Sequence, residues 1–380
     1  MDRREFVSHT ALLGVAAGLG TRPGASAQPP RALIMDAMGE LRNEYDDALI
    51  RDIVAPHIVK DVSAQTTQFL QVVDAAIAGQ TRAVLHDPAF QALEAAWRGV
   101  QFKYAGGKGV NLARVAAELG AETLATGFLG GGNGAFVRRV LDRQGVRHDF
   151  IEIEGETRTN FSVEDDSDDP PTTFNEPGPK VEAKDWQALI AKCQMLASRA
   201  RWAALGGSLP PGAPPDIFVQ LALLFRQVGC KVVLDADGEP LKQALKGGVD
   251  FVKPNSAEAE RVLDRPVRSD KEALDAAAAL HGMGPAIAIV SRGDEGAVMA
   301  CSEGQFIGKP PQIDARSTIG SGDSLIGAML WAIEEGKPLE EAFKWGIAAG
   351  AATATTDGSE IARKPVIQEL LARVQVERVA

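Results

Sequence analysis

The residues best suited to chemistry lie late in the chain, in the segment Ser317-Thr318-Ile319-Gly320-Ser321-Gly322-Asp323-Ser324-Leu325. An apolar pattern with helical spacing follows, so Asp323 is predicted to lie at or near a helix N-terminus. The first N–H groups of a helix lack partners within it and favour a negatively charged ligand. Gly320 and Gly322 would let an anion approach closely, and Asp323 could accept a proton from a substrate hydroxyl. An amide turn formed by Gly320, Ser321 and Gly322, followed by one base, favours phosphoryl transfer.

A simpler interpretation of this segment is available. Gly-x-Gly-Asp is a common sequence, and an aspartate often does no more than cap a helix. The rest of the chain therefore has to support the catalytic interpretation.

Three further segments could bind the substrates of such a reaction. Ala105-Gly106-Gly107-Lys108-Gly109-Val110-Asn111 is a glycine-rich turn feeding a helix, in which Asn111 could bind hydroxyls; a plain tight turn is the alternative. Arg158 could grip a phosphate in bidentate fashion, although most arginines are solvated surface residues. Lys253, Asn255 and Glu258 could hold the water shell of Mg²⁺, or could simply begin a helix with ordinary first-turn acids.

Alternating strand-like and helix-like segments occupy the chain from Phe102 onward. This alternation predicts an α/β fold, a doubly wound, mainly parallel sheet with helices on both faces. Ligands bind beyond the carboxyl ends of the strands in such folds, and the polar motifs follow strands here. The stretch at about 150–178 interrupts the alternation with three short strand-like segments, Ile151–Ile153 among them, and predicts a small antiparallel β flap. A flap could exclude water from phosphoryl transfer or be a surface hairpin.

Composition sets the outer limits of function. The chain has 380 residues, 45 % of them hydrophobic, and a net charge of −11, which argues against a nucleic-acid binder. Cys193, Cys230 and Cys301 show no metal-ligand or disulfide spacing. No stretch is long and apolar enough for a stable membrane span.

The first hundred residues are atypical. Residues 1–27 resemble a twin-arginine signal segment, with Arg3 and Arg4 before a short apolar region; a frayed amphipathic N-terminus is the alternative. Residues 28–101 are predicted to form a mostly helical segment. Two pieces of it resemble other families: one resembles exported dipeptidases and the other the large sheath subunit of type VI secretion systems. A signal conflicts with the cytoplasmic location expected for ATP chemistry.

Residues 102–375 resemble a family, the PfkB-type carbohydrate kinases of the ribokinase-like fold. The matching residues are the Gly-Gly-Lys-Gly turn with Asn111, Thr157-Arg158-Thr159-Asn160, Asn175–Pro179, Gly207–Gly212, Asp235, Lys253-Pro254-Asn255 and Gly320-Ser321-Gly322-Asp323. The similar branch is that of the hexose-phosphate kinases: 1-phosphofructokinase, the minor 6-phosphofructokinase and tagatose-6-phosphate kinase. Several motifs in the right order are more specific than any one of them.

The resemblance implies a role for each matching residue. Asp323 would be the base, and the amides of Gly320, Ser321 and Gly322 would bind the moving phosphoryl group. The remaining implied contacts are sugar hydroxyls at Gly106, Gly107 and Asn111, sugar phosphate at Arg158 with Lys108, phosphate and Mg²⁺ at Lys253, Asn255 and Glu258, and nucleotide at Ser291, Gly293, Gly296 and the small-residue helix around Gly350. The implied activity is ATP- and Mg²⁺-dependent phosphorylation of fructose 1-phosphate or fructose 6-phosphate to the 1,6-bisphosphate. The predicted flap is thin, and a second subunit could complete it in a homodimer.

The N-terminal part departs from that family. Its members usually open with a strand ending in an Asn-Pro-x-x-Asp-type motif, which is missing here, so the central sheet should lack a strand. One hypothesis is that Ala32–Met35 fills this place and Asp36 replaces the sugar-binding aspartate. The open alternatives are a tagatose-6-phosphate kinase, an acceptor without a phosphate, and a weakly active nucleotide-binding remnant without a complete sugar site.

Overall fold

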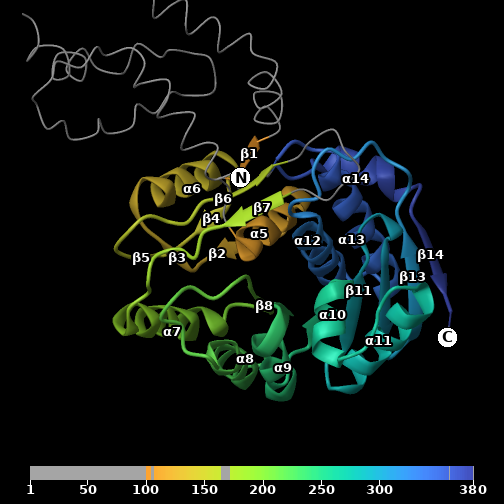
Figure 1. Cartoon of the computed structure of the whole chain (residues 1–380), viewed down its shortest axis with the longest axis horizontal. Coiled ribbons are helices and arrows are strands. Elements are labelled where there is room, and N and C mark those ends of the chain that lie inside the picture. The colour runs from red at the N-terminus through yellow and green to blue at the C-terminus, as the bar shows by residue number, and fades with distance from the viewer. Residues whose placement is uncertain (1–99, 104–106, 164–171, 359, 380) are drawn as a thin grey trace, which may run out of the picture. The chain divides into compact units, whose positions relative to one another are not determined.

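The computed structural model describes residues 100–103, 107–163, 172–358 and 360–379 (Figure 1). The chain divides into two compact units, Met1–Val100 with Val163–Asp168, and Gln101–Ser162 with Asp169–Ala380. Nearly all described residues belong to the second unit. The predicted signal segment 1–27, residues 28–99 of the predicted helical segment, and the hypothetical strand Ala32–Met35 with Asp36 lie outside the described residues.

A seven-stranded sheet with the order β14-β13-β12-β11-β10-β9-β8 runs through the second unit. Its parallel strands are β8 (Trp202–Gly206), β9 (Lys231–Asp235), β10 (Phe251–Val252) and β11 (Ile287–Ser291). Its antiparallel strands are β12 (Ala297–Cys301), β13 (Gly304–Lys309) and β14 (Gln375–Arg378). The predicted α/β class with a parallel sheet is confirmed, and the antiparallel strands extend it at one edge.

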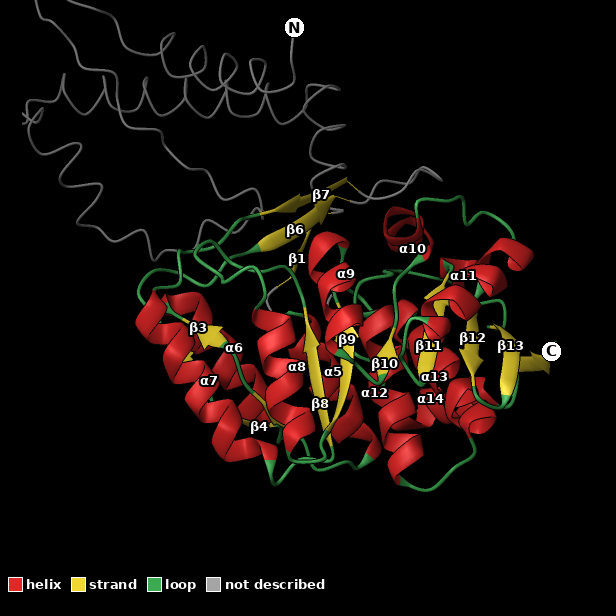
Figure 2. Cartoon of the chain, turned by 90° about the horizontal axis from the view of Figure 1, so that it is seen from below, coloured by secondary structure: helices red, strands yellow, loops and turns green. Residues whose placement is uncertain are grey.

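Helices cover both faces of this sheet (Figure 2). Packed on one face are α7 (Ala183–Ala197), α8 (Ile217–Gln227), α9 (Gly238–Gly247), α10 (Ser256–Leu263) and α11 (Asp270–Gly282). On the other are α5 (Lys108–Leu119), α12 (Ser321–Glu334), α13 (Leu339–Ala354) and α14 (Lys364–Leu371). Val232 packs toward the first layer and its neighbour Val233 toward the second. Because successive strand residues face opposite sides, a strand covered on both faces is apolar throughout.

In the described part of the chain, β8 is the last strand of the large sheet. Two parallel pairs are separate from it: β2 (Leu124–Ala125) with β4 (Arg147–His148), and β3 (Phe128–Leu129) with β5 (Ile151–Glu152). Helix α5 contacts both β2 and β8, and α6 (Gly131–Arg143) packs with the pairs in a smaller apolar cluster. Within the described part of the chain, β9 is the one strand that pairs with β8.

A three-stranded sheet, β1-β6-β7, lies beyond one end of the large sheet's strands (Figure 2). Its strands are β1 (Val100–Lys103), β6 (Asn160–Val163) and β7 (Thr172–Asn175). The prediction that Ile151–Ile153 belongs to this flap is wrong. Those residues pair with β3 instead, and the Ile153 amide donates to the Leu129 carbonyl at 3.0 Å. The reason is that their apolar side chains pack against the main core.

Two glycines let α13 approach α12 closely. A Cβ on Gly346 would lie 2.7 Å from Met329 Cγ and 2.9 Å from the Leu325 carbonyl oxygen. Four residues later, a Cβ on Gly350 would lie 3.1 Å from the Ser321 carbonyl oxygen. Residues four apart share one helix face, so this face of α13 sets the position of the first turn of α12.

Two expectations from composition can be compared with the described residues. No helix in the described ranges is both long and apolar enough to cross a membrane. The three cysteines are buried and free. Burial raises the pKa of Cys193 and of Cys230 to about 11, so these thiols have the character of core residues and not of nucleophiles.

Candidate active site

Asp323 and Asn111 meet at the centre of the candidate site. Asp323 lies in the first turn of α12, as predicted, and Asn111 lies in the first turn of α5. The Asn111 side-chain amide donates to Asp323 Oδ2 at 2.8 Å across a sequence separation of 212 residues. Both side chains are buried, with exposed fractions of 2 % and 7 %. A buried carboxylate held by an amide donor is a candidate for proton transfer at a defined position.

Arg114 orients Asn111 through the amide oxygen that does not contact Asp323. The sequence analysis did not identify this residue. Its Nη1 donates to Asn111 Oδ1 at 3.3 Å, and its Nε donates to Gln144 Oε1 at 2.7 Å. Burial lowers the pKa of Arg114 to about 10, with the nearby Arg363 adding to the fall and Glu360 opposing it. The sequence signal was the i, i+3 spacing from Asn111, which places both side chains on one helix face.

The turn before α12 has the geometry expected of an anion-binding turn. Gly320 is the N-cap with φ of 81°, a left-handed conformation that favours glycine. In the described part of the chain, the amides of Gly320 and Gly322 have no hydrogen-bond partner, whereas the Ser321 amide donates to the Thr318 carbonyl at 3.3 Å. Two of the three amides named from the sequence are therefore available to a ligand.

Lys253 borders this turn from the end of β10. A Cβ added to Gly322 would lie 3.0 Å from Lys253 Nζ. The ammonium group is 3.6 Å from Asp235 Oδ1, and the side chain is 5 % exposed. A lysine predicted from the sequence to bind phosphate thus lies beside the available amides.

Lys108 shares the same carboxylate. Its Nζ lies 2.9 Å from Asp235 Oδ1 and 3.9 Å from Glu258 Oε1. Burial works to lower the pKa of Lys108, but the carboxylates of Asp235, Glu258 and Asp323 together raise the pKa above its ordinary value. Asp235 therefore joins two lysines, a role that the sequence analysis did not assign. Its position at the carboxyl end of a buried strand was the available signal.

Asn255 and Glu258 are engaged in capping α10. Asn255 Oδ1 accepts from the Glu258 amide and Glu258 Oε2 accepts from the Asn255 amide, both at 2.8 Å. Oε1 of Glu258 faces Lys108. No group of three or more His, Cys, Asp or Glu side chains in the described ranges is arranged so that it could hold a metal ion by itself. Mg²⁺ commonly uses one or two carboxylates, waters and substrate phosphates, so Glu258 and Asp235 fit an ion that arrives with a nucleotide.

The predicted nucleotide loop follows β11. Ser291 forms an isolated parallel bridge with Asn255, and its amide donates to the Pro254 carbonyl at 3.1 Å. Gly293 and Gly296 have φ of 62° and 94°. A Cβ on Gly296 would collide with the Gly308 carbonyl oxygen, so the loop needs glycine there. Gly350 lies against the first turn of α12, as described above.

Of the remaining predicted residues, Gly107 is joined to this cluster through its carbonyl, which accepts from the Asn111 amide at 3.2 Å, whereas Arg158 makes no hydrogen bond or ion pair with it in the described part of the chain. Gly106 lies outside the described residues, and Gly107 is the exposed N-cap of α5. Arg158 is half-buried between two anchored neighbours. The Thr157 hydroxyl bonds Gly130, and the Thr159 amide donates to Glu176 Oε2 at 2.8 Å.

Comparison with known proteins gives one consistent result. Residues 72–365 match the pfkB family carbohydrate kinase. The chain is 31 % identical to a 1-phosphofructokinase of Bacillus subtilis over 276 residues, 73 % of this chain and 89 % of that protein. It is 35 % identical to a 1-phosphofructokinase of Rhodobacter capsulatus over 238 residues, 62 % of this chain and 75 % of that protein.

Solved structures agree with the sequence matches. Phosphofructokinase-2 of Escherichia coli, in complex with substrates and products, superposes with a TM-score of 0.66 at 30 % identity, covering 70 % of this chain and 87 % of that one. A ribokinase of Arabidopsis thaliana superposes with a TM-score of 0.58 at 23 % identity, covering 70 % and 87 %. The ribokinase likeness supports the fold alone.

Proposed function

This chain belongs to the pfkB family of carbohydrate kinases and is an ATP-dependent sugar-phosphate kinase; on that premise we propose that it phosphorylates fructose 1-phosphate to fructose 1,6-bisphosphate. The observation that carries the proposal is the buried hydrogen bond between Asn111 and Asp323 beside two unpaired glycine amides. Helix capping alone would not require a buried side-chain partner 212 residues away.

Asp323 is the proposed base. It accepts the proton of the sugar hydroxyl as that oxygen bonds to the γ-phosphorus of ATP. The bond from the γ-phosphorus to the bridging oxygen breaks, and ADP leaves with the electron pair. Asn111 fixes the carboxylate through its 2.8 Å hydrogen bond to Oδ2. Because in-line phosphoryl transfer depends on positioning and charge stabilisation, a rigid base is of more value here than a strong one.

Charge in the site must be completed by the substrates. Lys108 and Lys253 carry two positive charges, and Asp235, Glu258 and Asp323 carry three negative ones, so the cluster has a net charge of −1. We propose that Glu258 and Asp235 would hold a Mg²⁺ ion bound to ATP, which would supply positive charge against the phosphates. The lysines then contact the phosphate oxygens, and the amides of Gly320 and Gly322 receive the transferred group.

The two substrates approach from opposite sides of the amide turn in this proposal. Gly107 and Asn111, with Gly106 outside the described residues, bind sugar hydroxyls, and Arg158 binds the phosphate that the sugar already carries. The residues assigned to the nucleotide are Ser291, Gly293, Gly296, Asn255 and Gly350. The assignment of the nucleotide-binding residues is supported by a direct connection between them. The bridge between Asn255 and Ser291 joins the loop after β11 to the turn that carries Lys253.

Fructose 1-phosphate is proposed over the alternatives because the curated relatives described above are 1-phosphofructokinases. Fructose 6-phosphate and tagatose 6-phosphate are the competing acceptors. A homodimer through the β1-β6-β7 sheet and a cytoplasmic location remain predictions that follow from the kinase assignment.

A spectrophotometric screen tests this proposal. ADP formation is measured with ATP, Mg²⁺ and each of the three sugar phosphates, with unphosphorylated fructose as the matched control. We expect the highest kcat/KM for fructose 1-phosphate and little turnover of fructose. ATP-induced stabilisation without ADP from any acceptor would identify a remnant and refute the activity.

The role of Arg158 has a separate test. Arg158→Ala should raise KM for the sugar phosphate by about tenfold or more, since a hydrogen bond to a charged group contributes about 1.5–3 kcal/mol. KM for ATP should stay unchanged. An unaltered KM for all three sugar phosphates would show that Arg158 is not the phosphate clamp.

A further inference from the structure

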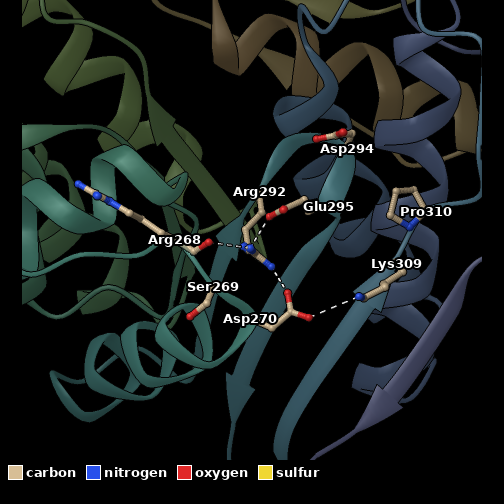
Figure 3. A pocket seen from close by; sticks show the side chains of 8 residues that line it. All are labelled: Arg268, Ser269, Asp270, Arg292, Asp294, Glu295, Lys309 and Pro310. Atoms are coloured by element: carbon tan, nitrogen blue, oxygen red, sulfur yellow. Dashed lines mark hydrogen bonds and ion pairs between the residues drawn. The ribbon is translucent and has the colours of Figure 1, made fainter.

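One residue of the nucleotide loop carries a buried charge that the proposed chemistry does not use. Arg292 lies between Ser291 and Gly293, and only 5 % of its side chain is exposed. It is one of the eight residues that line an open cavity of about 400 Å³, and Figure 3 shows these side chains. Burying a guanidinium is costly unless its donors are matched, so its partners identify what it does.

Those partners come from the start of α11 and from the loop itself. Arg292 forms ion pairs with Asp270 and Glu295, and its Nη2 approaches the Arg268 carbonyl oxygen at 3.5 Å. Asp270 is the first residue of α11 and also lies 3.4 Å from Lys309 Nζ, at the end of β13. Figure 3 shows Arg292, Glu295, Asp270 and Lys309 connected in one chain of contacts.

The backbone of the loop is otherwise bonded mostly to itself. The Arg292 amide donates to the Gly296 carbonyl at 2.8 Å, and the Gly296 amide donates to the Gly293 carbonyl at 3.1 Å. At its start, Ser291 attaches the loop to Pro254 and Asn255, which lie between β10 and α10. The Arg292 side chain thus connects the first part of the loop to α11, on the sheet face opposite α12 and α13.

We propose that Arg292 is a positioning residue for nucleotide binding: through Asp270 it ties the 291–296 loop to the N-terminus of α11 and holds its backbone in the ATP-binding conformation. The inference rests on the proposed nucleotide role of Ser291, Gly293 and Gly296. Arg292 itself does not touch the nucleotide in this scheme. Losing it should weaken ATP binding without changing the sugar site.

A separate ligand in the cavity explains the arrangement less well. The lining carries three basic residues and three acidic ones, namely Arg268, Arg292, Lys309, Asp270, Asp294 and Glu295. These charges balance, and the buried guanidinium is already paired on two sides. A ligand of either charge would have to break existing ion pairs.

The test compares Arg292→Met, Arg292→Lys and Asp270→Asn with the full-length protein. The Kd of Mg·ATP is measured by calorimetry without sugar, and KM for ATP and for fructose 1-phosphate by ADP formation. We expect Arg292→Met and Asp270→Asn to raise the Kd and KM of ATP on the order of 10–100-fold, which corresponds to the loss of one hydrogen bond to a charged group. Arg292→Lys should recover part of the loss, and KM for the sugar should stay within about twofold, because the sugar site is distant.

Glu272→Gln is the matched control. Glu272 accepts from the Ser269 amide at 3.0 Å and caps the same helix without touching Arg292. It should lower thermal stability while leaving the Kd of ATP unchanged. Equal ATP affinity in the wild type and in Arg292→Met or Asp270→Asn, or an equal loss in Glu272→Gln, would overturn the positioning role. If the wild type itself failed to bind ATP, the proposed function would fall first.

Discussion

Replacing Asp323 by Asn separates proton transfer from every other property of the site. The two side chains are nearly equal in volume, and both are accepted in the first turn of a helix. Asn111 would still bond the new amide oxygen, but a bond to a neutral group is weaker than one to a carboxylate by about 1 kcal/mol. The unfolding temperature should therefore fall by no more than about 2–4 °C, the usual shift for that energy in a domain of this size.

The kinetic effect should be much larger. A positioned general base contributes about 10²–10⁴-fold, which is roughly 3–5 kcal/mol of activation free energy at 1.36 kcal/mol per decade. An amide cannot accept the hydroxyl proton, so kcat should fall by that factor. The Kd of Mg·ATP should stay within about threefold, because Asn111 and the glycine amides are unchanged.

The assay combines coupled ADP formation for kcat with calorimetry for the Kd of ATP. Asp314→Asn is the matched control, since Asp314 is exposed in the loop before α12 and should behave as wild type. A loss of kcat below tenfold in Asp323→Asn would refute the role of base. An equal loss in affinity for ATP would show that the carboxylate acts in binding and not in proton transfer.

Three further substitutions test the geometry around this turn. Gly322→Ala adds a Cβ 3.0 Å from Lys253 Nζ, which should reduce turnover at least tenfold in the ADP assay. Alanine also raises helix propensity by up to about 1 kcal/mol, so thermal melts should show equal or higher stability. Full activity would contradict the phosphate-binding turn. Lys108 has a raised pKa, so its charged form is favoured by folding below its ordinary pKa of 10.5, and that contribution is lost only as pH rises through the higher folded value. The difference in unfolding temperature between wild type and Lys108→Met should thus be constant from about pH 6 to 9, and a change across that range in a pH series of melts would contradict the prediction. Gly346→Ala should lower the free energy of unfolding by about 1–3 kcal/mol, because its Cβ overpacks α12 against α13. Gly282→Ala adds a Cβ that meets open space at the end of α11, so it should leave that free energy unchanged or raise it by up to about 1 kcal/mol. Denaturant unfolding of both variants measures the difference, and equal effects would rule out the close approach of the helices.

Local patterns in the sequence were sufficient for the helix starts that carry the site. The first turn of α12 at Asp323, the α5 turn before Asn111, and the capping residues Asn255 and Glu258 all follow from residue type and spacing over a few positions. The strands β8, β9 and β11 could be predicted equally well, because strands that are buried on both faces appear in the sequence as short continuous apolar runs.

Pairing between distant segments was decided only in the tertiary structure. The strand at Ile151 could be predicted from the sequence, but the strand with which it pairs could not. Strand pairing depends on which apolar face meets the core and not on the strand's own residues. Asp235 was named from the sequence only as a residue that matches the family, and its role became visible when packing brought Lys108 and Lys253 to the same oxygen.

The sequence by itself therefore determined the kind of chemistry and the order of its parts, since glycine turns, caps and periodicity act within one or two turns of the chain. The tertiary structure alone decided which of these parts meet. Asn111 reaches Asp323, and Arg292 reaches Asp270, because the helices α5, α12 and α11 pack on defined faces of one sheet. That packing is set by the summed burial of many side chains, a quantity that no single motif contains.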